Sequence, residues 1–185
     1  MKLRLNSILE SSYANGPGNR FVIWTQGCDF NCPGCFNPET HSFDGGCELE
    51  TDYLFEKITQ KKGIEGVSVS GGEPLLQLEP LMALLKKIKN ETDLSVLVFT
   101  GFNFDEILAD YNKNLALEFI DIIIAGKYER DKKVNNPLIS SANQILYFLT
   151  DRYDISKIPD IDCEVIIDST GLIAITGVRV AVIGN

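Results

Sequence analysis

The sequence has few of the residues that common hydrolytic sites and membrane proteins need. Its 185 residues include one histidine, one tryptophan and two methionines, and no apolar run approaches the roughly 20 residues of a membrane-spanning helix. A Ser–His or Cys–His hydrolase would have to use His41, and no G-x-S-x-G motif accompanies it, so a hydrolase is disfavoured. The N-terminus lacks the continuous apolar run of a signal peptide, and we therefore expect a cytoplasmic protein.

Basic residues are also scarce relative to acidic ones. The chain has 17 Lys and Arg residues against 26 Asp and Glu, a formal net charge of −9. Nonspecific binding to nucleic acid or to an anionic membrane needs clustered basic side chains. We therefore expect neither nucleic acid nor a membrane among the partners, whereas the charge leaves a protein partner open.

Hydrophobic patterning predicts a single α/β domain over residues 1–185. The predicted strands cover 20–25, 67–70, 94–99 and 120–125, the predicted helices cover 50–62, 76–89 and 104–111, and further strand candidates are 145–149, 163–167 and 172–175. Strands that alternate with helices predict a mostly parallel sheet. The carboxyl ends of such strands share one edge, where ligands bind. The core is expected over about 13–150, with a C-terminal strand extension over about 151–185.

The cysteines are distributed unevenly. Cys28, Cys32 and Cys35 lie close together in a loop predicted over 26–46, whereas Cys47 and Cys163 stand apart. A disulfide framework is not expected in a reducing compartment. Three thiolates at C-x3-C-x2-C spacing suit an iron–sulfur cube, and three protein ligands on its four irons leave one iron open for chemistry. Cys163 lies in a predicted strand, where an inert buried thiol is expected, and Cys47 is also interpreted as inert.

A zinc site is the alternative interpretation of this cluster. Cys47 or His41 would have to complete it. Zinc sites usually combine a C-x2-C unit with a second pair of Cys or His ligands, and the sequence offers no such second pair. A non-catalytic zinc or iron–sulfur binding module therefore stays open as a different class of function.

The three-cysteine spacing, together with Gly71-Gly72-Glu73-Pro74 after a predicted strand, resembles the radical S-adenosylmethionine enzymes. The resemblance implies a partial (β/α)6 barrel with mostly parallel strands, to which this chain would add C-terminal strands. It implies a [4Fe-4S] cluster with Cys28, Cys32 and Cys35 as its ligands, and S-adenosyl-L-methionine on the open iron. Reduction of this sulfonium would give a 5′-deoxyadenosyl radical. One departure is Gly34, which stands where the family often has an aromatic residue near the adenine.

Further segments resemble the activating enzymes of glycyl radical proteins, and in particular the activase of anaerobic ribonucleotide reductase. They are Asn15-Gly16-Pro17-Gly18-Asn19-Arg20, Gln26-Gly27-Cys28, Cys32-Pro33-Gly34-Cys35, Phe36-Asn37, Thr100-Gly101-Phe102, Ala125-Gly126-Lys127 and Ser140-Ser141-Ala142-Asn143-Gln144. In this chain, Ala125 replaces an acidic residue of that group and Ala142 interrupts a Ser-Ser-Asn-Gln run. The resemblance implies a glycyl radical enzyme as protein substrate, a flavodoxin or ferredoxin-type electron donor and an anaerobic setting. The alternative is a radical enzyme that modifies a peptide or small metabolite.

The same resemblance implies a set of cofactor-binding residues, with no catalytic residue beyond the cluster ligands. They are Phe36, Asn37, Gly71, Gly72, Glu73, Thr100, Gly101 and Lys127. The backbone of residues 71–73 would bind the methionine ammonium, because glycines let a ligand approach closely. Lys127 would contact the cofactor carboxylate or is a solvated loop lysine. Arg20 would meet an acidic group near the cluster or is a surface residue, and Trp24 is expected in the core.

Overall fold

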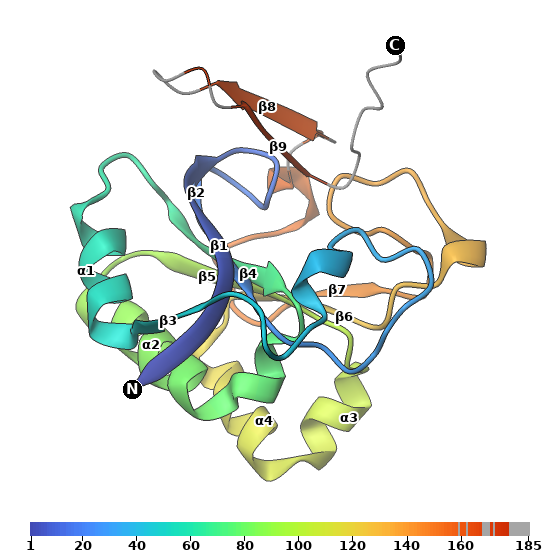
Figure 1. The fold of residues 1–185 in the computed structure, drawn as a ribbon, viewed down its shortest axis with the longest axis horizontal. Coiled ribbons are helices and arrows are strands. Elements are labelled where there is room, and N and C mark those ends of the chain that lie inside the picture. The colour runs from blue at the N-terminus through green and yellow to red at the C-terminus, as the bar shows by residue number, and fades with distance from the viewer. Residues whose placement is uncertain (159, 162, 168–170, 172, 178–185) are drawn as a thin grey trace.

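The computed structural model describes residues 1–158, 160–161, 163–167, 171 and 173–177 and shows an α/β fold around a seven-stranded sheet (Figure 1). The strand order across the sheet is β3-β1-β2-β4-β5-β6-β7. These strands are β1 (Lys2–Ser12), β2 (Arg20–Thr25), β3 (Cys47–Glu50), β4 (Gly66–Gly71), β5 (Ser95–Thr100), β6 (Ile122–Ala125) and β7 (Ile145–Phe148). A separate antiparallel hairpin consists of β8 (Cys163–Ile167) and β9 (Ile173–Gly177).

The centre of the sheet is parallel and its two edges are antiparallel. Strands β2, β4, β5 and β6 pair in parallel, whereas β1 pairs antiparallel with β2 and with β3, and β7 pairs antiparallel with β6. The expected α/β class with a mostly parallel central sheet is confirmed. The sequence patterns missed β1 and β3, although Leu3 and Leu5 alternate with polar residues in β1 as strand residues do. The last strand candidate corresponds to β9, and Leu172 lies outside the described residues.

Helices occupy each crossover between neighbouring parallel strands. They are α1 (Thr51–Gln60), α2 (Leu78–Glu91), α3 (Phe104–Ala109) and α4 (Tyr111–Ala116). The single helix predicted over 104–111 is divided at Asp110, because its carboxylate accepts hydrogen bonds from the backbone N–H groups of Asn112 and Lys113 and caps α4. Among the described residues, no helix is both long and apolar enough to cross a membrane.

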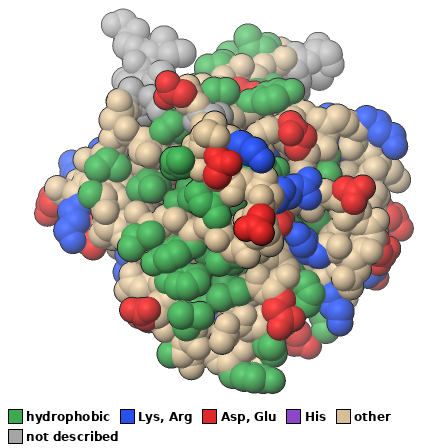
Figure 2. Space-filling view, turned by 180° about the vertical axis from the view of Figure 1, so that it is seen from behind, with side chains coloured by type: hydrophobic (Ala, Val, Ile, Leu, Met, Phe, Trp, Pro, Cys, Tyr) green, Lys and Arg blue, Asp and Glu red, His purple; other side chains and the backbone are tan. Residues whose placement is uncertain are grey.

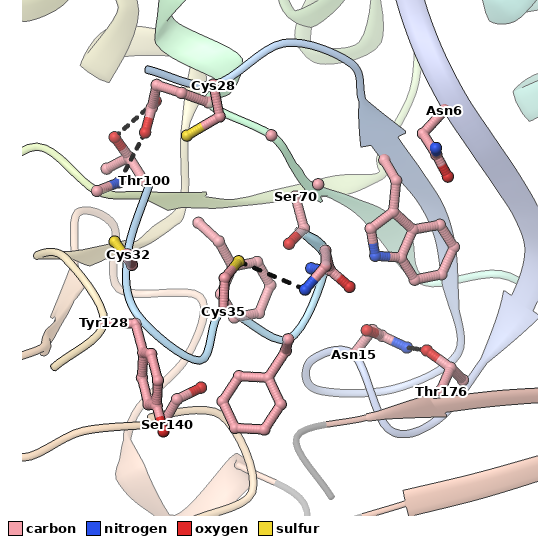
Figure 3. Close-up of a pocket in the computed structure, with 18 of the residues that line it drawn as sticks. Asn6, Asn15, Cys28, Cys32, Cys35, Ser70, Thr100, Tyr128, Ser140 and Thr176 are labelled. Carbon is pink, nitrogen blue, oxygen red and sulfur yellow. Dashed lines mark hydrogen bonds between the residues drawn. The ribbon is translucent and has the colours of Figure 1, made fainter. Parts of the chain in front are cut away.

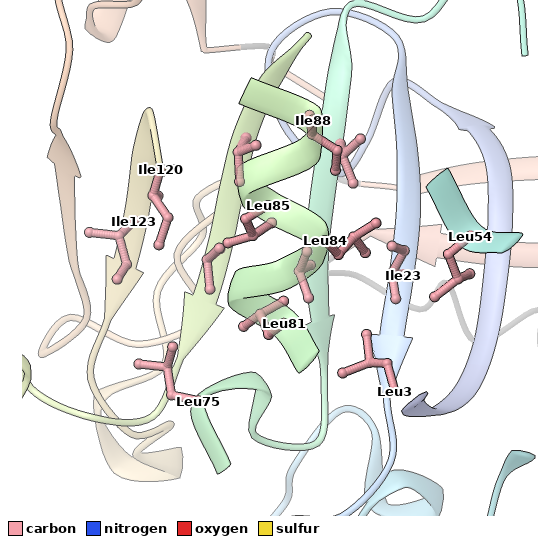
Figure 4. Packing of buried hydrophobic residues seen from close by; sticks show 14 of the residues in the cluster. Leu3, Ile23, Leu54, Leu75, Leu81, Leu84, Leu85, Ile88, Ile120 and Ile123 are labelled. Carbon is pink, nitrogen blue, oxygen red and sulfur yellow. The ribbon is translucent and has the colours of Figure 1, made fainter. Parts of the chain in front are cut away.

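The main hydrophobic core lies between the helices and one face of the sheet (Figure 4). Leu81, Leu84, Leu85 and Ile88 of α2 follow helical spacing and are fully buried. Alternate strand residues such as Ile23, which is also fully buried, face them. Because successive strand residues point to opposite faces, the intervening residues point away from the helices. That second face carries the site described below.

Arg20 is fully buried at the start of β2, which corrects both interpretations of this residue. Its guanidinium donates hydrogen bonds to Ser68 Oγ at 3.1 Å, to Ser95 Oγ, and to the carbonyl of Val67 at 2.7 Å. Desolvation lowers the pKa of Arg20 to about 10. The side chain therefore joins the beginnings of β2, β4 and β5, at the strand ends away from the cysteine loop.

Candidate active site

A cavity of about 510 Å³ lies on the face of the sheet opposite the helices. Trp24, Ser70 and Phe99, which alternate with core residues along their strands, line its wall. The loops that follow β2, β4, β5 and β6 also line it, so the expected convergence of these loops at one edge is confirmed. Trp24 is half-buried in the cavity wall, which corrects its expected place in the core.

The three clustered cysteines face this cavity from one loop (Figure 3). All three thiols are free and half-buried. The loop turns tightly between the second and third cysteines, where the backbone N–H of Cys35 donates to the carbonyl of Cys32 at 3.1 Å and Gly34 has a φ of +76°. The backbone N–H of Asn37 donates to Cys35 Sγ at 3.4 Å, a contact that favours the thiolate.

Backbone hydrogen bonds fix the beginning of the cysteine loop. The N–H of Gln26 donates to the carbonyl of Arg4 at 3.0 Å, that of Gly27 to Thr40 at 2.8 Å and that of Cys28 to His41 at 3.0 Å. These contacts join residues 26–28, where the loop begins, to residues 40–41 near its end and to Arg4 in β1. The loop is therefore held at its base, while the segment with the cysteines projects over the cavity.

The donor set fits a polynuclear iron–sulfur group. Burial raises the pKa of the Cys28 and Cys35 thiols, so binding an iron–sulfur group there would release protons. Within the described part of the chain, no three His, Cys, Asp or Glu side chains gather as the ligands of a single metal ion would. Cys47 is exposed on β3 and is absent from the cavity lining, whereas His41 lines it. Three thiols in one loop can bind three irons of a cube and leave the fourth iron without a protein ligand.

Gly71 and Gly72 let the loop after β4 pack against the cysteine loop. A Cβ at Gly72 would lie 2.3 Å from the carbonyl oxygen of Gly27, and one at Gly71 would lie 2.4 Å from the amide nitrogen of Thr25. The N–H groups of Gly72 and Glu73 are already used, since they donate to the carbonyls of Thr25 at 2.8 Å and Gly27 at 2.9 Å. These glycines therefore let the loop after β4 approach the backbone of Thr25 and Gly27 closely.

Glu73 lines the cavity, but its buried carboxylate bonds to the chain. One oxygen accepts hydrogen bonds from Thr100 Oγ1 at 2.8 Å and from the N–H of Leu75 at 2.9 Å, and the other accepts from the N–H of Gly101 at 2.7 Å. Burial outweighs these three bonds and raises the pKa of Glu73 to about 7. The side chain joins the loops after β4 and β5, which places Thr100 and Gly101 beside the cysteine loop.

Aromatic side chains surround the third cysteine. Phe36 packs edge-on against Tyr128, with ring centroids 5.1 Å apart, and both line the cavity. A Cβ at Gly34 would lie 3.7 Å from Tyr128 Cε1. Tyr128 therefore lies beside Gly34, the position at which the radical enzymes often have an aromatic residue. The sequence reasoning missed Tyr128, although it follows the strand-ending Gly126-Lys127. Lys127 is exposed at the rim, with Nζ 4.4 Å from the ring centroid of Phe30.

The Ser140–Gln144 run folds against the loop that follows β6. The side-chain oxygen of Gln144 accepts from the N–H groups of Ser140 at 2.8 Å and Ser141 at 3.2 Å, and its amide nitrogen donates to the carbonyl of Gly126 at 3.1 Å. Ala142 leaves this arrangement intact, because it contributes a backbone bond to Lys132 at 2.8 Å. Ser140 and Gln144 therefore complete one side of the cavity.

Comparison with known proteins adds independent findings. Residues 14–147 match the family described as a 4Fe-4S single cluster domain. An anaerobic ribonucleoside-triphosphate reductase-activating protein from Pasteurella multocida is 34% identical over 145 residues, covering 74% of this chain and 91% of that protein. The protein of the same name from Haemophilus influenzae is 31% identical over 148 residues, covering 72% and 90%. A pyruvate formate-lyase-activating enzyme from Clostridium pasteurianum is 36% identical over 127 residues, covering 64% of this chain and 52% of that enzyme.

Proposed function

Because the chain belongs to the 4Fe-4S single cluster domain family and to the family of anaerobic ribonucleoside-triphosphate reductase-activating proteins, we propose that it installs a glycyl radical on a partner enzyme. The partner is an anaerobic ribonucleotide reductase. The radical is generated from S-adenosylmethionine with a [4Fe-4S] cluster held by Cys28, Cys32 and Cys35. A flavodoxin or ferredoxin-type protein supplies the electron.

The observation that carries this proposal is the meeting of three free thiols with the strand-end loops in one cavity. Three protein ligands leave one corner of a cube for S-adenosylmethionine. A reduced cluster held by Cys28, Cys32 and Cys35 would supply one electron to the sulfonium, so that a carbon–sulfur bond would break to give methionine and a 5′-deoxyadenosyl radical. Transfer of a hydrogen atom from a backbone glycine of the partner would then give 5′-deoxyadenosine and a glycyl radical.

The other residues of the cavity bind and position the cofactor in this proposal. An ammonium donates hydrogen bonds, so the methionine end would meet carbonyl oxygens of the loop over residues 71–73, whose N–H groups at Gly72 and Glu73 already have partners. Glu73 acts as a positioning residue, because its carboxylate fixes Thr100 and Gly101. The aromatic side chain of Phe36 lines the same cavity.

Asn37 and Lys127 complete the proposed cofactor site. The N–H of Asn37 supports the thiolate of Cys35, and Lys127 lies at the rim, where a cationic side chain suits the cofactor carboxylate. We also propose that the parallel strands β2, β4, β5 and β6 belong to a partial (β/α)6 barrel. The helix in each crossover and the cavity on the opposite face support this assignment. The whole chain is then one radical S-adenosylmethionine domain, with a core over about 13–150 and an extension over about 151–185.

Anaerobic reconstitution tests the proposed function. The protein is loaded with iron and sulfide, reduced with dithionite and mixed with S-adenosylmethionine, and 5′-deoxyadenosine is measured by chromatography. We expect product from the reduced protein only, and a glycyl radical signal in electron paramagnetic resonance once anaerobic ribonucleotide reductase is added. An intact, reduced cluster that yields no 5′-deoxyadenosine would contradict the proposal, and so would one stoichiometric zinc ion bound by the cysteines.

A further inference from the structure

The β8–β9 hairpin adds a wall to the cavity from outside the matched family region. The family match ends at residue 147, and the hairpin begins at Cys163. Ala174, Ile175, Thr176 and Gly177 of β9 nevertheless line the same cavity as the three cysteines. Figure 3 shows Thr176 on one side of the cavity and the cysteine loop on another. Part of the cavity wall therefore comes from an element that lies outside the matched family region.

The inner face of the hairpin is held by polar contacts to the turn between β1 and β2. The carboxylate of Glu164 accepts hydrogen bonds from Ser12 Oγ at 2.7 Å and from the N–H of Tyr13 at 3.0 Å. Asn15 Nδ2 donates to Thr176 Oγ1 at 2.8 Å. Glu164 and Thr176 lie opposite each other in the hairpin register, so both contacts come from the same face. An isolated two-stranded hairpin is marginal in water, and these contacts fix it to the main sheet.

The outer face of the hairpin is aliphatic and exposed. Val165 pairs with Ile175 and Ile167 with Ile173 across the two strands. These side chains are 52%, 37%, 66% and 60% exposed, in that order. Apolar side chains gather at this end of the molecule in Figure 2. Contiguous exposed aliphatic side chains of this kind mark an interaction surface more often than isolated ones do.

The patch is continuous with the cavity, which indicates its occupant. Ile175 belongs both to the exposed patch and to the cavity lining. Under the proposed function, on which this inference rests, the group that must reach the cavity is a backbone glycine. Glycine has no side chain, so its recognition depends on the flanking polypeptide. Within the described residues, β8 and β9 pair only with each other, so each keeps an outer edge that an extended polypeptide can join.

We infer that the outer face of the β8–β9 hairpin, formed by Val165, Ile167, Ile173 and Ile175, is the docking surface for the glycine-bearing segment of the protein substrate. The segment is expected to be extended and to carry apolar residues beside its glycine. The hairpin holds it beside the cavity, and Glu164 and Thr176 are positioning residues that keep the hairpin in place.

The test uses the reconstituted full chain with two matched double variants. Ile167→Thr with Ile173→Thr removes apolar surface from the patch while retaining β-branched residues that suit a strand. Leu108→Thr with Tyr111→Thr removes exposed apolar surface from α3 and α4, where the side chains are 45% and 75% exposed. Glycyl radical formation is measured against the concentration of anaerobic ribonucleotide reductase, and 5′-deoxyadenosine is measured without it.

We expect the hairpin variant to raise the half-saturating reductase concentration about tenfold or more, with a nearly unchanged maximal rate. Its formation of 5′-deoxyadenosine without the reductase should equal that of the wild type, and the α3–α4 variant should behave as the wild type in both assays. Hydrogen exchange of β8 and β9 should match the wild type in the free variant, which verifies that the hairpin is folded. It should slow in the wild type when reductase is added.

Three results would overturn the inference. One is an unchanged half-saturating concentration in the folded hairpin variant. Another is unchanged hydrogen exchange of β8 and β9 with saturating reductase. The third is a wild-type dimer that dissociates in the hairpin variant, since a second copy of this chain would then occupy the patch. Loss of the proposed function is distinguishable from all three, because it would appear as absent 5′-deoxyadenosine in the wild type.

Discussion

Replacing Glu73 with glutamine should reduce the pH dependence of the stability of the cluster-free protein. The carboxyl is buried among the loops after β4 and β5, and its pKa is raised from 4.5 to about 7 because desolvation outweighs three hydrogen bonds. Between these values the folded chain retains a proton that the unfolded chain has lost. The stability contributed by this proton is fully present below the unfolded pKa and is lost as the pH rises through about 7.

The magnitude follows from the two pKa values. Between pH 5 and pH 8, this one group should lower the free energy of unfolding of the wild type by about 2.5 kcal/mol. The Glu73→Gln variant has no such proton. The glutamine also turns its amide N–H₂ toward one of the groups that donate a hydrogen bond to Glu73. This donor–donor contact should lower the free energy of unfolding by about 1–3 kcal/mol at every pH. The wild type should therefore exceed the variant in stability by more at pH 5 than at pH 8.

Urea unfolding followed by circular dichroism, under reducing conditions and at intervals between pH 5 and pH 8, measures both proteins. Contributions from titratable groups that do not interact with Glu73 are common to both proteins and cancel in the difference. Glu79→Gln, at an exposed carboxyl near the start of α2, serves as the matched control. A stability difference between wild type and Glu73→Gln that is the same at pH 5 and pH 8 would refute the reasoning. It would mean that the hydrogen bonds to Glu73 fully offset or outweigh its desolvation, so that its pKa is not raised.

Three further predictions concern other parts of the chain. Cys32→Ala should abolish 5′-deoxyadenosine formation in the reconstituted protein, whereas Cys163→Ala, which changes a half-buried thiol in β8, should remain nearly fully active; the reverse order would reassign the cluster ligands. Gly72→Ala should destabilise the protein by about 1–3 kcal/mol in urea unfolding, and by more than Gly101→Ala, because its Cβ meets backbone rather than an aromatic ring; equal losses would contradict this. Arg20→Lys should cost about 3 kcal/mol, because one ammonium cannot replace the buried guanidinium fork, and full stability in the variant would refute that role.

Local sequence signals predicted much of the framework. The β-branched run over 20–25, the amphipathic spacing in 76–89 and the glycines after strands gave the alternating elements and the edge where their loops meet. The cysteine spacing predicted a shared loop, because covalent distance alone keeps Cys28, Cys32 and Cys35 together. These features depend on residues near one another in the chain, so they can be predicted without knowledge of the fold.

Other features depend on contacts between distant segments. Arg20 is buried because Ser68 and Ser95 on two other strands accept its hydrogen bonds. Trp24 faces the cavity because the helices pack on the opposite face of β2, toward which Ile23 points. Glu73 was predicted to act through its backbone, whereas its side chain joins two loops. Tyr128 lies beside Gly34, and β9 lines the same cavity as the cysteine loop, although these residues are far apart in the sequence.

The sequence by itself predicted three thiols in one loop and the alternation of the central strands with helices, since both follow from short-range spacing and periodicity. Only the tertiary structure decided which polar groups are buried and which segments enclose the cavity. The physical reason is that desolvation and hydrogen bonding of Arg20 and Glu73, and the placement of the hairpin through Glu164 and Thr176, depend on partners brought together by folding.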